Sequence, residues 1–287
     1  MKVIRHVKAM KEALANNKKK KIGFVPTMGY LHDGHLSLVD VARKENDLVV
    51  MSIFVNPLQF GPTEDLATYP RDEKHDTELA KKHGVDILFI PDVKEMYPDH
   101  FSIEMKLTTK TNVLCGKSRP GHFDGVITVL TKLFHIVEPT NAYFGLKDAQ
   151  QFSVVDTLIH QLNFPIHLVG LPTVRERDGL AKSSRNVYLN DQERKDALVL
   201  YDTLKLGKQL VTDGTTVPSL KDELTKYLTR HCKGKVDYLE ILSFPQLEEV
   251  HSIESTIIIA IAVHFDRARL IDNIILHADG TTVNRIG

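Results

Sequence analysis

Apolar and polar positions along residues 1–171 alternate between two kinds of pattern. Short apolar runs predict strands at residues 21–25, 48–55, 85–90, 142–144 and 167–171. Helical spacing between these runs predicts helices at residues 36–44, 72–83, 125–137 and 149–162. Strands and helices that alternate in this way predict right-handed βαβ crossovers and a parallel sheet with helices on both faces.

The pattern changes after residue 189. Asn190 and Glu193 have the spacing of a capping box, which predicts a long helix through about residue 210. A second helix is expected after Pro218, followed by strands at residues 238–242, 256–263 and 270–276. The expected fold class is therefore α/β, with a parallel-sheet N-terminal domain of residues 1–173 and a smaller C-terminal α+β domain of residues 174–287.

Composition narrows the choice of partners and compartment. The chain has 37 Lys and Arg against 37 Asp and Glu, and this neutral balance, without a basic strand that carries aromatic residues, argues against nucleic acid as a partner. The longest apolar run, at residues 257–263, is too short to span a bilayer. Cys115 and Cys232 lie far apart and no apolar N-terminal segment precedes the first strand, so we expect a cytoplasmic protein.

The sequence PTMGYLHDGH at residues 26–35 carries the clearest chemical signal. A predicted strand ends at Pro26, and two histidines, His32 and His35, flank Gly34 where a helix should begin. The N-terminus of a helix offers unpaired N–H groups and attracts phosphate, and imidazole adds hydrogen-bond donors. Because ligands bind beyond the carboxyl ends of parallel strands, this turn predicts a nucleoside triphosphate site.

A second polar segment follows Gly179 and has the sequence KSSR. Its two cations and two hydroxyls are what a mobile clamp on a polyphosphate needs. The four residues are Lys182, Ser183, Ser184 and Arg185. We expect this segment to close over the nucleotide.

Simpler interpretations exist for both motifs. His32 and His35 could be surface histidines in a turn, and the KSSR segment could be an ordinary loop at a domain junction. A zinc site assembled from these histidines with His122 or Cys115 lacks the usual ligand spacing and any Cys-x-x-Cys pair.

Together the two motifs resemble the nucleotidylyltransferase superfamily, which includes class I aminoacyl-tRNA synthetases. More closely, stretches in order over nearly the whole chain resemble the pantoate–β-alanine ligase family: residues 26–35, 52–61, 69–71, 119–126, 143–151 and 178–186. The resemblance implies a Rossmann-like N-terminal domain, a homodimer, and condensation of pantoate with β-alanine using ATP and Mg²⁺. The implied route passes through a pantoyl adenylate and releases AMP and pyrophosphate.

The resemblance also implies the site residues. His35 is the implied catalytic histidine, assisted by His32, with Lys147 and Arg185 as cations on the phosphates. Gln59 matches a substrate-binding position, as does Gln151; an amide can bind a carboxylate and a hydroxyl of pantoate without a fixed positive charge. The implied ATP-binding residues are Met28, Gly29, Tyr30, Leu31, His32, Asp33, Gly34, His35, Gly145, Leu146, Lys147, Asp148, Val174, Lys182, Ser183, Ser184 and Arg185.

Several points stay open from the sequence. Asp148 could bind a ribose hydroxyl or Mg²⁺, whose protein ligands are not assigned, and the roles of Asn56 and His122 are undecided. Leu146 and Lys182 depart from residues common in the family, and Leu146 is expected to point away from the ligand. An alternative function is a cytidylyl- or adenylyltransferase acting on a phosphate ester, which would need a cationic acceptor pocket. Another is a nucleotide- or RNA-binding module.

Overall fold

The computed structural model describes the whole chain except residues 16, 18, 63, 65, 99 and 100. Its first part is a six-stranded sheet in the order β1-β4-β3-β2-β5-β6, and every strand pair described in it is parallel. The strands are β1 (Lys2–Ile4), β2 (Ile22–Thr27), β3 (Leu48–Ile53), β4 (Ile87–Phe89), β5 (Asn141–Gly145) and β6 (His167–Leu171). The expected parallel α/β architecture is confirmed.

Helices cover both faces of this sheet, because alternate strand residues point to opposite sides. Phe24 packs in a core with α6 and α7, whereas the next residue, Val25, packs in a second core with α2 and α3. The helices of this part are α1 (Val7–Ala15), α2 (Asp33–Glu45), α3 (Glu73–Lys82), α4 (Val93–Met96), α5 (Leu114–Ser118), α6 (His122–Val137) and α7 (Ala149–Gln161), with 3-10 turns η1 (Pro57–Gln59) and η2 (Leu146–Asp148).

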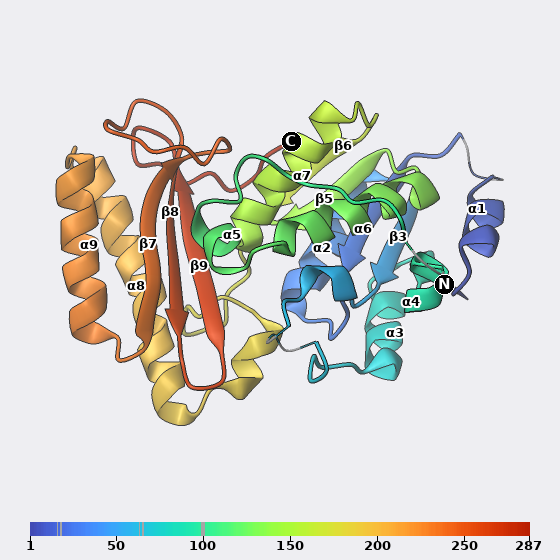
Figure 1. Ribbon diagram of the computed structural model, residues 1–287, viewed down its shortest axis with the longest axis horizontal. Helices are drawn as coiled ribbons and strands as arrows, with labels where there is room; N and C mark the ends of the chain where they lie inside the picture. Colours follow the sequence, from blue (N-terminus) through green and yellow to red (C-terminus); the bar gives the residue numbers. More distant parts are fainter. Residues whose placement is uncertain (16, 18, 63, 65, 99–100) are drawn as a thin grey trace.

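The second part is a three-stranded antiparallel sheet in the order β7-β8-β9. Its elements are η3 (Ser184–Tyr188), α8 (Asp191–Thr212), α9 (Val217–His231), β7 (Lys235–Ser243), β8 (Ile257–His264) and β9 (Arg269–Leu276). Ile259 and Ile261 face α8 and α9, while Ile258 and Ala260 pack into the same core as α6 and α7. The sheet therefore lies between its own helices and the first part of the chain, as Figure 1 shows.

Local sequence signals identified some element ends and missed others. The capping box is present: Asn190 Oδ1 accepts from the N–H of Glu193, and the Glu193 carboxylate accepts from the N–H of Asn190. Strand β1 and helices α1, α4 and α5 were not predicted. Helix α6 begins at His122 rather than at residue 125. Its N-cap is Gly121, which has φ +81° and no side chain to form a cap, so the sequence carries no capping signal for this end.

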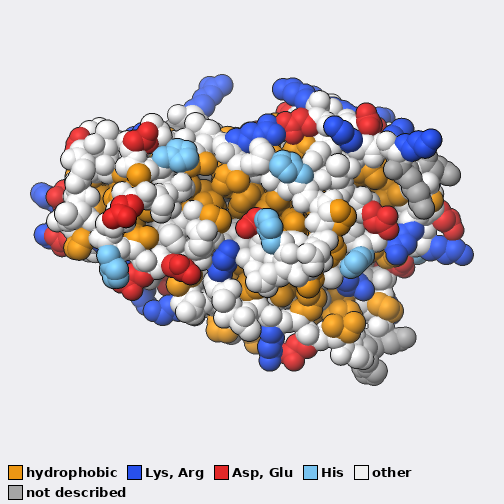
Figure 2. Space-filling view, turned by 90° about the horizontal axis from the view of Figure 1, so that it is seen from above, with side chains coloured by type: hydrophobic (Ala, Val, Ile, Leu, Met, Phe, Trp, Pro, Cys, Tyr) orange, Lys and Arg blue, Asp and Glu red, His pale blue; other side chains and the backbone are white. Residues whose placement is uncertain are grey.

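The surface carries charges of both signs. Acidic and basic side chains are interspersed on the face that Figure 2 shows, with hydrophobic side chains exposed between them. Among the described residues, no helix combines the length and the apolar character needed to cross a membrane.

Candidate active site

The turn at residues 28–35 lies at the carboxyl end of β2 and leads into α2. His32 is the N-cap of this helix, and its Nδ1 accepts a hydrogen bond from the N–H of Gly34 at 3.1 Å. His35 Nδ1 accepts from the N–H of His32 at 3.3 Å. Because each Nδ1 is an acceptor, each ring carries its proton on Nε2. The capping box therefore leaves each histidine with an Nε2–H donor for a ligand.

The electrostatic surroundings keep both rings neutral. Burial, followed by the charge of Lys147, lowers the pKa of His32 to about 4. Burial, followed by His32 and Lys147, lowers the pKa of His35 well below its usual value. The two ring centroids are 4.1 Å apart. At neutral pH these histidines act as hydrogen-bond donors and not as cations.

A buried carboxylate from α3 holds the turn in shape. Gly29 and Tyr30 both have positive φ, +86° and +52°. Asp76, which is 1% exposed, accepts from the N–H groups of Tyr30 at 2.8 Å and Leu31 at 2.7 Å. A Cβ on Gly29 would lie 2.9 Å from Ile53 Cγ2, so glycine is required there. Sequence analysis did not identify Asp76.

A cavity of about 240 Å³ opens beside this turn, beyond the carboxyl ends of β2, β5 and β6. The expected site residues that line it are Met28, His32, Gly34, His35, Gln59, Gly145, Lys147, Asp148, Gln151, Val174, Lys182, Ser183, Ser184 and Arg185. Gly29, Tyr30, Leu31, Asp33 and Leu146 are not in its lining. The side chains of Leu31 and Leu146 are instead buried in the hydrophobic cores.

Asn56 orients the first glutamine. Its Nδ2 donates to Gln59 Oε1 at 3.2 Å and to the carbonyl of Gly125 at 3.0 Å. Gln59 Nε2 in turn lies 3.1 Å from Met28 Sδ. Both amides are buried, at 1% and 8% exposure. The oxygen of Gln59 is therefore engaged by the protein, and its NH₂ group lies on the Met28 side of the cavity.

His122 fixes the backbone of the same glutamine. Its Nε2 accepts from Arg119 Nη1 at 3.1 Å, so its Nδ1 carries the proton and donates to the carbonyl of Gln59 at 2.8 Å. Burial, followed by the charge of Arg119, lowers the pKa of His122 to about 4. Arg119 is itself held by Glu64, 2.6 Å from its Nε. In the sequence RPGH at residues 119–122, the arginine and the histidine thus hold the backbone carbonyl of Gln59 in place.

The 182–185 segment lies against the first turn. The N–H of Lys182 donates to the carbonyl of Val174 at 2.9 Å, and its Nζ is 3.0 Å from Asp33 Oδ2. Ser183 Oγ accepts from the N–H of Arg185 at 3.2 Å and begins η3. The ion pair brings together the two sequence motifs, which are about 150 residues apart.

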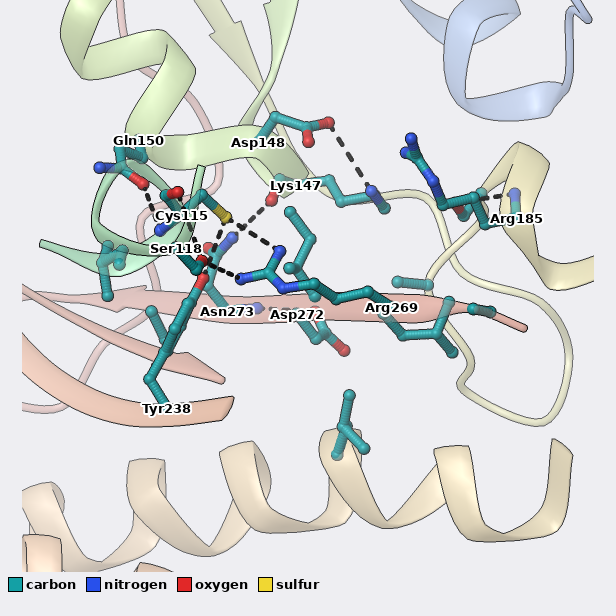
Figure 3. A pocket seen from close by; sticks show the side chains of 18 of the residues that line it. Cys115, Ser118, Lys147, Asp148, Gln150, Arg185, Tyr238, Arg269, Asp272 and Asn273 are labelled. Atoms are coloured by element: carbon teal, nitrogen blue, oxygen red, sulfur yellow. Dashed lines mark hydrogen bonds and ion pairs between the residues drawn. The ribbon is translucent and has the colours of Figure 1, made fainter. Parts of the chain in front are cut away.

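A second cavity of about 440 Å³ adjoins the first (Figure 3). Lys147, Asp148 and Gln151 line both cavities. On its far side Arg269 lies 3.4 Å from Cys115 Sγ and 2.8 Å from Asp237 Oδ2. The second cavity is thus formed between the first part of the chain and the C-terminal sheet.

Comparisons with known proteins show which family the chain resembles. The family model described as pantoate–β-alanine ligase matches residues 2–275. The pantothenate synthetase of Bacillus pumilus (strain SAFR-032) is 58% identical over 279 residues, which cover 96% of this chain and 97% of the relative. The crystal structure of pantothenate synthetase from Thermus thermophilus matches with a TM-score of 0.92 and 45% identity, over 97% of this chain and 99% of the other. That of pantoate–β-alanine ligase from Francisella tularensis, complexed with β-γ ATP and β-alanine, matches with a TM-score of 0.79 and 34% identity, over 95% and 97%.

Proposed function

This chain belongs to the pantoate–β-alanine ligase family and condenses pantoate with β-alanine in an ATP-dependent reaction, and we propose that the chemistry takes place in the 240 Å³ cavity through a pantoyl adenylate. One observation carries the assignment of the site. Two neutral histidines, each with its ring proton on Nε2, and two glutamines line one cavity at the carboxyl ends of parallel strands.

In the first step the carboxylate of pantoate attacks the α-phosphorus of ATP, and pyrophosphate leaves. The reactants are both anionic, so catalysis depends on positioning and on neutralising charge. His35, assisted by His32, donates its Nε2–H to an oxygen of the α-phosphate. Lys147, Lys182 and Arg185 neutralise the departing pyrophosphate. Neutral imidazoles suit this role because they donate hydrogen bonds without attracting the pantoate carboxylate away from phosphorus.

The glutamines hold pantoate for this attack. Gln59 offers its NH₂ group, since its oxygen already accepts from Asn56. Gln151 is partly buried on the wall shared by the two cavities. An amide binds a carboxylate or a hydroxyl without a fixed charge that would weaken the nucleophile.

We also propose that Mg²⁺ accompanies the triphosphate. Among the described residues, no group of three His, Cys, Asp or Glu side chains is arranged to hold a metal ion. The half-exposed carboxylate of Asp148, which lines both cavities, fits an ion bound mainly by phosphate oxygens and water. When bound, Mg²⁺ would supply charge neutralisation on the phosphates.

In the second step the amine of β-alanine attacks the acyl carbon of the adenylate, and AMP leaves. The adenylate must be kept from water until the amine arrives. We propose that the 182–185 segment, which the predicted 174–287 domain contributes, closes over the nucleotide for this purpose. We further propose a cytoplasmic homodimer.

The experiment that tests the proposed route is release of pyrophosphate and AMP from ATP and Mg²⁺, first with pantoate alone and then with β-alanine. We expect pyrophosphate in an amount close to that of the enzyme with pantoate alone, and sustained AMP formation only with both substrates. If AMP forms only when both substrates are present and pantoate alone gives no burst of pyrophosphate, the adenylate route is contradicted. Release of pyrophosphate without AMP would favour nucleotide transfer to an acceptor.

A further inference from the structure

Two consecutive residues of β9, Asp272 and Asn273, connect the C-terminal sheet to two segments that line the active site. Both are buried, at 4% and 9% exposure. Neighbouring residues of a strand point to opposite faces. Asn273 shares its face with Ile275, which packs into the core of the first part of the chain. Asp272 shares its face with Leu270, which packs with α8 and α9.

Asn273 holds the turn that carries Lys147. Its Nδ2 donates to the carbonyl of Leu146 at 3.0 Å and to the carbonyl of Lys147 at 2.8 Å, and Figure 3 shows the second of these bonds. A single amide group thus uses both of its hydrogens on consecutive carbonyls of η2, the turn between β5 and α7. Because these carbonyls define the peptide planes on either side of the Lys147 Cα, the two bonds determine the direction in which the lysine side chain leaves the backbone.

Asp272 holds the other segment. Its carboxylate accepts from Arg175 at 2.6 and 2.9 Å, and from the N–H of Asn273 at 2.8 Å. The Arg175 guanidinium also lies 3.7 Å from the ring centroid of Tyr201 on α8. Arg175 pairs with Ala181 in a β-bridge, and the following residue is Lys182. Strand β9 therefore contacts both the turn that carries Lys147 and the segment that leads to Lys182, and it fixes the position of one relative to the other.

We propose that Asn273 is a positioning residue of the ligase, which acts through the carbonyls of Leu146 and Lys147 to direct the Lys147 side chain toward the triphosphate. Asp272, through Arg175, holds the segment that carries Lys182 in place beside it. This inference rests on the role given to Lys147 in the proposed function. Both hydrogens of the Asn273 amide are engaged by these two carbonyls, so it acts on the lysine through the backbone. Its importance follows from geometry, because a displacement of about 1 Å in a catalytic group can reduce turnover about 100-fold.

The first test compares Asn273→Ala with the wild type and with Asn141→Ala. Asn141 also lies in a strand and donates one side-chain hydrogen bond, to Asn46 Oδ1 at 2.7 Å, at the opposite end of β5 from Lys147. We expect Asn273→Ala to lower kcat about 10- to 100-fold and to raise the KM for ATP, since Lys147 is no longer held in position. The KM for pantoate should change less than about twofold, and Asn141→Ala should leave kcat near the wild-type value.

The isosteric variant Asn273→Asp provides a readout that a purely structural role would not produce. An ionised carboxylate has no hydrogen to donate and would repel the two carbonyls, whereas a protonated carboxyl can donate one hydrogen bond. Burial beside two carbonyl oxygens raises the pKa of such a carboxyl. We expect the kcat of Asn273→Asp, relative to the wild type, to rise as the pH is lowered from 8 to 6. The ratio for Asn273→Ala should stay constant.

A double variant identifies the group through which Asn273 acts. If that group is Lys147, Lys147→Ala combined with Asn273→Ala will lose no more activity than Lys147→Ala alone. Additive losses would overturn the inference, and so would single Asn273 variants whose kcat and ATP KM stay within twofold of the wild type. Full activity of Lys147→Ala would instead show that the role given to Lys147 in the proposed function is wrong. Should Asn273→Ala fail to fold, the pH response of Asn273→Asp decides, and a flat response overturns the inference.

Discussion

The two histidines of the first turn and the two lysines that face them are positioned in different ways. His32 and His35 cap the helix that they begin, through hydrogen bonds that span two or three residues. Lys147 and Lys182 lie on segments that β9 holds from the other sheet. The proposed donors to the α-phosphate thus belong to a local motif, whereas the proposed cations for the leaving group depend on how the two sheets are packed. This difference would suit the proposed reaction, in which the cations bind pyrophosphate and then release it.

The largest loss of turnover is expected from a substitution in the histidine turn at residues 28–35. His35→Ala removes the Nε2–H donor and also the Nδ1 acceptor for the N–H of His32, so we expect turnover to fall by about two to four powers of ten. His160→Ala, which changes an exposed histidine on α7, is the control. Steady-state AMP formation measures both. Unchanged turnover in His35→Ala would remove this residue from the mechanism and would favour the cations as the main catalytic groups.

The support of the first turn can be tested separately from its histidines. Asp76→Ala leaves the N–H groups of Tyr30 and Leu31 without their acceptor, which should lower the free energy of unfolding by about 1–3 kcal/mol. We also expect kcat/KM for ATP to fall about 10-fold or more, because the turn loses its shape. Urea unfolding and initial rates measure the two effects.

The control for this variant lies on the same helix. Asp72→Ala removes the N-cap of α3, whose carboxylate accepts from the N–H of His75. It should cost about 1 kcal/mol of stability and leave kcat/KM for ATP unchanged. If Asp72→Ala lowers kcat/KM as much as Asp76→Ala, the kinetic effect belongs to the helix and not to the turn.

The difference between contacts within a few residues and contacts between separate elements also explains which features could be predicted from the sequence. The start of α2 and the histidine pair were predictable because their signals lie within a few residues of one another. Asp76 is 46 residues from Tyr30, and Asn273 is 126 residues from Lys147. Nothing in the local pattern around either residue indicates its partner, because packing of separate elements brings the pairs together. The parallel sheet was predictable from its apolar runs, whereas the three-residue edge strand β1, with only Ile4 buried, has too weak a pattern.

The buried histidines should make stability depend on pH. His32 and His122 have a pKa of about 4 in the folded protein, against an ordinary value of 6.5. As the pH falls from 6.5 toward 4, the unfolded chain takes up protons that the folded protein does not. The free energy of unfolding should therefore decrease over this window, by at most about 1.4 kcal/mol per pH unit for each histidine, and stay level above it.

Urea unfolding at pH 7, 6 and 5 measures this dependence. Between pH 6.5 and 5 most carboxyl groups remain ionised, so histidines dominate the change. The double variant His32→Asn, His122→Gln should be less stable at pH 7 and should lose less stability on acidification than the wild type. An equally steep loss in the double variant would assign the pH dependence to other groups.

The smallest kinetic effect is expected at the contact between the histidine turn at residues 28–35 and the 182–185 segment. Asp33→Asn removes the ion pair with Lys182 Nζ, in which the lysine and aspartate side chains are 28% and 67% exposed, and such pairs contribute about 0.2–1 kcal/mol. In the proposed function Lys182 binds the triphosphate and must leave Asp33 to do so. Removing the pair should therefore lower the KM for ATP, by about fivefold at most. The difference should shrink as salt is raised.

Asp40→Asn is the matched control, since Asp40 lies on the same helix and pairs instead with His83 at 2.7 Å. It removes an equal charge from α2 without touching Lys182, so the KM for ATP should stay within experimental error of the wild type. A higher KM in Asp33→Asn alone would mean that Asp33 keeps Lys182 in its working position, and the 182–185 segment would then be as rigidly placed as the histidine turn.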